Sequence, residues 1–169
     1  GSSSVTLLTN DQGNSGSGGA LTATSTVAIT VNGVNDGPQN SVPGAQAVDE
    51  DNNLTFSTSG GNAISVSDVD VGASDLQVTL STTDATLSLP GSAGLTFSVG
   101  DGTADTSMTF TGSVANINTA LDGLVHTPNL HSNGSSSVTI LTNDQGNSGS
   151  GGSLGDTDAV AITVNPVND

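Results

Sequence analysis

The sequence predicts an all-β sandwich with one short crossover helix, and three observations lead to this fold class. Apolar residues alternate with polar ones in many short runs, and turns that contain glycine or proline separate these runs. Only one segment, 113–124, places its apolar residues at the helical spacings of three and four. The aromatic residues are three phenylalanines, so the core must be built from Val, Leu, Ile and Ala, which suit a thin two-sheet core.

One stretch of the chain occurs twice. Residues 1–36 recur at 134–169 with a constant offset of 133 positions, and 29 of the 36 aligned residues are identical. Similarity at a fixed period marks a tandem array. We therefore predict that residues 1–36 are the C-terminal strand-loop-strand piece of a preceding repeat. Residues 37–169 are then one complete repeat of normal domain size, with the boundary at about Asp36.

The elements follow in order from the apolar pattern. Residues 1–9 and 25–32 predict two strands joined by a Gly/Ser/Asn loop, and 137–165 repeats this unit. Within 45–57, two short strands are expected on either side of the acidic step at 49–51. Further strands are predicted at 63–67, 76–82, 85–90, 94–100, 107–112 and 123–128.

The helix predicted at 113–124 has recognisable ends. Val114, Ile117, Leu121 and Leu124 give it one apolar face. Ser113 is a suitable N-cap residue, and Gly123 is a suitable stop.

The charge balance is one-sided, with sixteen acidic residues, no Lys or Arg and a formal net charge of −16. One interpretation is that the charge keeps a long array soluble; the other is that grouped acids hold cations. We favour the second, because the acids are clustered and the absence of Cys leaves metal binding as the common substitute for disulfides. Nucleic acid is excluded as a partner, since nothing in the chain can neutralise phosphates. No apolar run reaches membrane-spanning length, so we expect no membrane insertion.

Several motifs in order carry a family resemblance. They are VNDGP at 34–38, VDED at 48–51, SVSDVD at 65–70, ANINTALDGLVHTP at 115–128, and NDQGNSGSGG before a final AITVN and VND. With these motifs the chain resembles the cadherin-like (immunoglobulin-like) β-sandwich tandem repeats of giant bacterial surface proteins and adhesins. The resemblance implies an extracellular, bacterial cell-surface location, adjacent repeats as partners, and a role in cell adhesion as a spacer. One departure is His126, where the family leads us to expect Tyr.

The acidic groups suggest a calcium site. Asp68 and Asp70 form a D-x-D step at a strand end, and alternation would place both side chains on one side, about 6.6 Å apart. Calcium takes six to eight oxygen ligands and is favoured over zinc, because these ligands are hard oxygens without Cys. The resemblance further implies that such a step, an acidic residue near the domain start and an Asn-Asp linker hold Ca²⁺ between successive repeats. The candidate ligands are Asn35, Asp36, Asp49, Glu50, Asp51, Asp68, Asp70, Asp144, Asn168 and Asp169, with Asp11 as the counterpart of Asp144 in the first copy.

The sequence also bears on two other functional classes, enzymes and ligand-binding modules. The string at 151–155 matches the G-x-S-x-G nucleophile elbow, but the first copy has Ala20 in place of the serine, so we expect no enzyme. The alternative is a carbohydrate- or protein-binding β-sandwich module, whose usual exposed aromatic platform would need the Trp or Tyr that this chain lacks.

Residues 1–33, the first copy of the repeated strand pair, are expected to contact another molecule. One sandwich has room for only one of the two similar strand pairs, and the local pair at 134–166 is expected to fill it. Residues 1–33 would then present an apolar stripe and open strand edges. This predicts a homotypic contact or a strand swap through 1–33.

Overall fold

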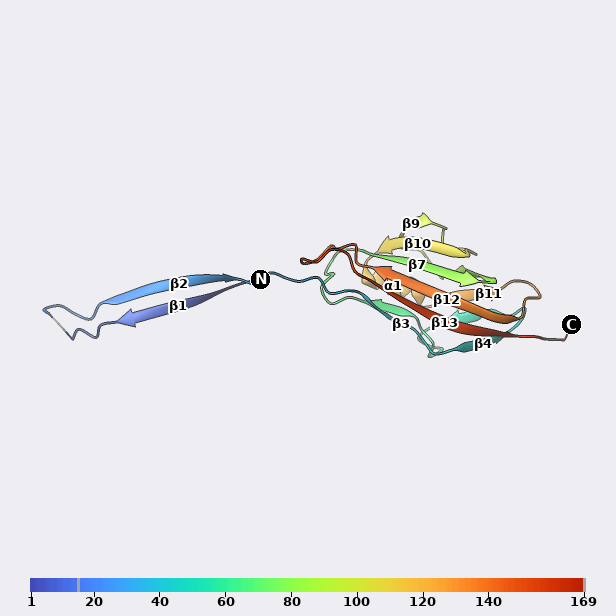
Figure 1. Ribbon diagram of the computed structural model, residues 1–169, viewed down its shortest axis with the longest axis horizontal. Coiled ribbons are helices and arrows are strands. Elements are labelled where there is room, and N and C mark those ends of the chain that lie inside the picture. Colours follow the sequence, from blue (N-terminus) through green and yellow to red (C-terminus); the bar gives the residue numbers. More distant parts are fainter. Residues whose placement is uncertain (15, 169) are drawn as a thin grey trace. The chain divides into compact units, whose positions relative to one another are not determined.

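The computed structural model describes residues 1–14 and 16–168, and the chain divides into two compact units (Figure 1). The first unit is Gly1–Gly33, and the second begins at Val34. Val34 belongs with the second unit because it forms a parallel bridge with Ser150, and the Asn35 N–H donates to the Ser150 carbonyl at 3.0 Å.

The first unit is an antiparallel hairpin of β1 (Ser2–Asn10) and β2 (Thr22–Thr30). Among the described residues its sheet has these two strands alone. Both strands are exposed along their whole length. The hairpin forms because its two strands alternate and its connecting loop is rich in Gly, Ser and Asn.

The second unit is built on a six-stranded sheet. Its order is β4 (Gln46–Asp49), β13 (Gly155–Asn165), β12 (Gly134–Asn143), β7 (Leu76–Thr83), β10 (Ser107–Gly112) and β9 (Thr96–Val99). All neighbouring strands are antiparallel except β13 and β4, which run parallel.

A smaller sheet faces this one and closes the sandwich. It has the order β5 (Leu54–Phe56), β11 (Leu124–Pro128) and β8 (Ala85–Ser88), and β3 (Gln39–Ser41) pairs with β6 (Ser65–Ser67) beside it. The alternating faces of both sheets meet in one apolar core that includes Phe56, Leu87, Phe110, Ile140 and Ile162. The predicted fold class, an all-β sandwich with one short helix, is confirmed.

The single described helix, α1 (Val114–Leu121), connects β10 to β11. The Ser113 side chain accepts a hydrogen bond from the Asn116 N–H, which is the predicted N-cap. Gly123 follows the helix with φ of +114°, a conformation that glycine adopts without steric cost. Ile117 and Leu121 bury the apolar face of the helix in the core.

His126 lies fully buried on β11, at the position where the family resemblance would place Tyr. Its Nε2 lies 2.8 Å from the Ser136 hydroxyl, which itself donates to the Thr83 carbonyl. Nδ1 has no hydrogen-bond partner among the described residues. Burial lowers the pKa of His126 below its ordinary value of 6.5, because the charged imidazolium would lose its hydration.

We expect this histidine to make folding acid-sensitive. The unfolded chain takes up a proton below pH 6.5 that the folded chain resists, so the free energy of unfolding is unaffected by His126 above that pH and falls below it. The loss approaches about 1.4 kcal/mol per pH unit. Urea unfolding at pH 7.5, 6.0 and 5.0 measures it, and His126→Phe should remove it while His131→Gln should not. Equal acid sensitivity in all three proteins would show that His126 is not responsible.

Candidate functional site

The structure separates the predicted metal ligands into two groups at opposite ends of β13. At the start of this strand, Gly155 is paired with Asn143, next to Asp144. At its end, the Asn165 carbonyl accepts from the Glu50 N–H at 2.9 Å. The eleven residues of β13 span about 33 Å at the usual rise of a strand. Glu50 lies at the end of β13, whereas Asp70 lies near Asp144 at its start, so the two carboxylates cannot bind one ion within a single unit.

Five predicted ligands come together at the first of these ends, and we call them the junction cluster: Asn35, Asp36, Asp68, Asp70 and Asp144. Asn35 holds the incoming chain against the loop 144–154. Its side-chain amide donates to the Asp144 carboxylate and to the Gly152 carbonyl, and its Oδ1 accepts from the Ser148 hydroxyl at 3.1 Å. The backbone of Gly149 passes so close that an added Cβ would lie 2.6 Å from the Asn35 nitrogen. The linker residue Asn35 is consequently a buried part of the sandwich, not a flexible connector.

Asp144 closes this loop from inside, with 1% of its surface exposed. Its Oδ1 accepts from the N–H groups of Gly146 and Leu154, each at 2.8 Å. Burial alone would raise the pKa of Asp144, but the N–H groups of Leu154 and Gly146 and the Asn35 amide outweigh burial and lower it below 3.8. Asp144 is therefore ionised at neutral pH, and its negative charge lies near that of Asp70.

Asp68 and Asp70 approach each other in a different way from the one predicted. They follow β6 in a bend, and alternation along a strand does not align them. Asp68 Oδ1 accepts from the N–H groups of Asp70 and Val71, each at 3.0 Å, which folds the chain back on itself. Asp70 Oδ2 accepts from the Asp36 N–H at 3.0 Å, which fastens the bend to the linker. The expected D-x-D pair is present, but a turn creates it.

The two carboxylates leave oxygens without a partner. Asp68 Oδ2 and Asp70 Oδ1 are shielded from solvent and have no hydrogen-bond partner among the described residues. Burial raises the pKa of Asp68 above 3.8, and the contact with the Asp70 carboxylate adds to this. The pKa of Asp70 is lowered, chiefly by the Asp36 N–H, although burial and the Asp144 charge oppose this. Two neighbouring carboxylates with unpaired oxygens shielded from solvent would be stabilised by a proton or a cation between them.

A hollow adjoins the junction cluster at Asp36 and Asp68. A hollow of about 270 Å³ is lined by Asp36, Gly37, Gln39, Ser67, Asp68 and Val69. Within residues 1–14 and 16–168, however, no set of three or more His, Cys, Asp or Glu side chains already surrounds a single metal position. The junction cluster thus brings carboxylate and amide oxygens together without a ready-made set of metal ligands among the described residues.

The second group of predicted ligands surrounds Glu50 at the other end of the unit. Glu50 is buried, and its Oε1 accepts from the Val167 N–H at 2.7 Å. Asp49 accepts from the Asn165 amide, whereas Asp51 accepts from the His131 N–H. Asn168 is exposed, and Asp169 lies outside the described residues. The acidic step at 49–51 thus binds the chain where it leaves the unit, and the junction cluster binds the chain where it enters.

Asp11 in the first unit is the counterpart of Asp144, and it makes the same contacts in an exposed hairpin loop. Asp11 Oδ1 accepts from the N–H groups of Gly13 and Leu21, so the hairpin loop closes in the same way. These N–H groups lower the pKa of Asp11. Asp11 is exposed, and this carboxylate therefore organises a loop.

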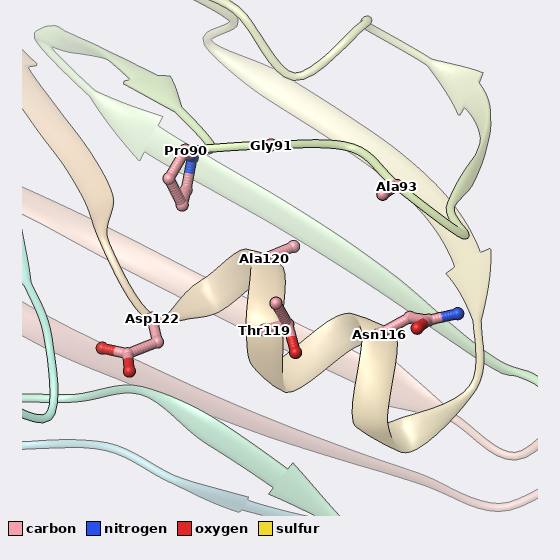
Figure 2. Close-up of a pocket in the computed structure, with 7 residues that line it drawn as sticks. All are labelled: Pro90, Gly91, Ala93, Asn116, Thr119, Ala120 and Asp122. Carbon is pink, nitrogen blue, oxygen red and sulfur yellow. The ribbon is translucent and has the colours of Figure 1, made fainter.

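A groove of about 240 Å³ lies between α1 and the loop 90–93 (Figure 2). Ala120 faces the loop, whereas the Asp122 carboxylate points away from it and accepts from the Thr58 N–H. The groove has no aromatic side chain in its lining and one ionisable group, Asp122. It lacks the stacking surface that a sugar-binding site would use. No helix in the described part of the chain has the length and apolar character needed to cross a membrane.

Sequence reasoning missed Ser148 and the carbonyl of Gly152, which complete the surroundings of Asn35. The available signal was that the loop at 143–152 repeats 10–19 without a single change, although the residues directly after it differ. In comparisons with known proteins, no protein-family model and no curated protein matches this chain.

Proposed function

We propose that the chain is a calcium-binding repeat module of a long extracellular array, and that Ca²⁺ stiffens the junction between successive repeats. The observation that carries the proposal is the pair of buried, unpaired oxygens on Asp68 and Asp70. Asp144 and the linker residues Asn35 and Asp36 lie beside them. The function is structural, and we assign the module no catalytic role.

The chemistry of these groups favours a hard cation. The ligands are carboxylate and amide oxygens, which suit Ca²⁺. With no Lys or Arg in the chain, apart from histidines and the amino terminus only a bound cation can offset the repulsion among the acids. Asp68, Asp70 and Asp144 would hold the ion on the side of the sandwich, while Asp36 would contribute from the linker. A preceding repeat would add oxygens from its own counterpart of Glu50, as the placement of Glu50 beside Val167 suggests.

Calcium should raise the stability of the second unit. An ion that binds the folded state alone adds about 2.7 kcal/mol to the free energy of unfolding at a hundredfold excess over Kd. We expect Kd near 10⁻⁴–10⁻³ M, as in extracellular modules. Calorimetric titration gives Kd, and thermal melting in chelator and in millimolar Ca²⁺ gives the stabilisation. Mg²⁺ at equal ionic strength is the control, and equal melting temperatures in all three buffers would contradict the proposal.

A matched pair of variants locates the site. Asp70→Asn removes a charge beside the unpaired oxygens and should weaken Ca²⁺ binding by roughly tenfold or more. Asp101→Asn removes a charge from an exposed turn, where Asp101 accepts from the Thr103 N–H, and should leave Kd unchanged. If both variants weaken binding equally, the ion is held by the general negative charge and not by the junction cluster.

A further inference from the structure

The first unit exposes a face that its own sequence copy buries. Val5, Leu7, Val27, Ile29 and Val31 are 41–63% exposed. The residues 133 positions later, Val138, Ile140, Val160, Ile162 and Val164, are at most 4% exposed in the core of the second unit. Four of these five pairs are identical, and Leu7 for Ile140 conserves volume, so the two faces are nearly interchangeable.

The hairpin is also already in the required conformation. β1 pairs with β2 from Ser2–Thr30 to Asn10–Thr22, and β12 pairs with β13 from Ser135–Thr163 to Asn143–Gly155, which is the same register moved by 133 positions. The loops close through Asp11 and Asp144 in the same way. Little ordering would therefore be needed for the hairpin to occupy the position of β12 and β13.

The hairpin cannot reach that position in its own chain. There Val31 would take the place of Val164, which pairs with Val48 near Glu50. Val34, three residues later, is bridged to Ser150 at the other end of β13, about 33 Å away by strand rise. Three residues extend about 10 Å at most. When β12 and β13 are displaced, Asn35 loses its partners in the loop 143–154, but β3 stays paired with β6. Residues 32–39 would then have to run almost fully extended for Val31 to reach the place of Val164 in its own chain.

We propose that the exposed face of β1 and β2 is a docking surface for the sandwich of a second copy of this chain, at the place of β12 and β13. We call β12 and β13 the resident hairpin. When it is in place, replacing it with the hairpin of another copy buries no additional area, so it stays in the sandwich. When the resident hairpin is disabled, the hairpin of another copy completes the sandwich. β1 then pairs with β7, and Thr6 lies opposite Ser81 as Thr139 does in the resident pairing. The first hairpin of each copy would fill the sandwich of the next copy, so the copies would assemble head to tail.

The test disables one hairpin at a time in the full chain. Ile140→Asp/Ile162→Asp places two carboxylates in the core and expels the resident hairpin. This variant should assemble into oligomers by light scattering and still melt cooperatively. Adding Leu7→Asp/Ile29→Asp should give a monomer without a cooperative transition, whereas Leu7→Asp/Ile29→Asp alone should leave a folded monomer. A folded monomer from Ile140→Asp/Ile162→Asp would overturn the proposal. It would also be overturned if this variant and the one that adds Leu7→Asp/Ile29→Asp were equally unfolded or equally aggregated.

Introduced cysteines report the register, since the chain has none of its own. Thr6→Cys/Ser81→Cys in the resident-disabled background should form disulfide-linked chains on a non-reducing gel, because directly opposed residues have the Cα separation of a disulfide. Thr24→Cys/Ser81→Cys is the control, since β2 would not border β7. Thr6→Cys/Ser81→Cys with the resident hairpin intact should stay unlinked. Linkage of all three proteins alike, or of none, would overturn the proposed docking. Calcium plays no part in this test, so its outcome is independent of the metal proposal.

Discussion

Ile162→Ala should lower the free energy of unfolding of the second unit by about 2–5 kcal/mol, whereas Ile29→Ala should change it by less than about 0.5 kcal/mol. Both residues are isoleucines at the same place in the two copies. Ile162 is 2% exposed in the core, and Ile29 is 41% exposed on the hairpin. Because the surrounding sequence is nearly the same, the difference measures burial rather than local propensity.

Urea unfolding of the two variants and the parent chain measures this difference. The main cooperative transition reports the second unit, because a lone hairpin has no cooperative core of its own. Equal losses at Ile162 and Ile29 would mean that the first unit is packed as tightly as the second, contrary to the exposed strands of β1 and β2.

Asp144→Ala should cost about 3 kcal/mol or more, and Asp11→Ala should be nearly neutral for the same transition. Removing the Asp144 carboxylate leaves the N–H groups of Gly146 and Leu154 and the Asn35 amide without their acceptor. A buried donor left unpaired, as the Asn35 amide would be, costs about 1–3 kcal/mol, and the half-buried Gly146 and Leu154 N–H groups add to this. Asp11 makes the equivalent backbone contacts in the exposed hairpin, where water replaces the lost acceptor.

The Asp144 contribution should also depend on pH. Since the pKa of Asp144 is below its ordinary value of 3.8, its contribution is complete above that pH and is lost as the pH falls below it. Urea unfolding at pH 7 and pH 3 should therefore show a smaller difference between the parent chain and Asp144→Ala at the lower pH. A difference that is the same at both values would show that the ionised form of Asp144 is not what stabilises the loop.

Local patterns predicted the parts of the fold that local interactions create. The hairpin and its loop form with the same register and the same aspartate contacts whether or not a core covers them. The helix begins directly after Ser113 and ends before Gly123, because both ends are determined by neighbouring residues. β3 was not predicted, since it is a three-residue strand between Pro38 and Pro43 that depends on its pairing with β6.

The candidate site was predicted less completely, because it depends on contacts between distant segments. The D-x-D step identified Asp68 and Asp70, but their turn and their contact with the linker through Asp36 are not visible in an alternating pattern. Asp144 is joined to Asn35 across 109 positions of sequence. Glu50 lies at the end of the unit where the chain leaves, because the parallel pairing of β4 with β13 places it there.

That parallel pairing has a mechanical consequence. The chain enters the second unit at Val34 and leaves beyond Asn165, at opposite ends of β13 (Figure 1). Once the Asn35 bonds and the pairing of β3 with β6 have given way, a pull on these two points draws β4 and β13 along their lengths in opposite directions. The hydrogen bonds between the two strands then bear the load in shear and must break together, whereas a hairpin pulled apart at its ends opens one bond at a time. The order of two strands thus makes the second unit resistant to tension along its length.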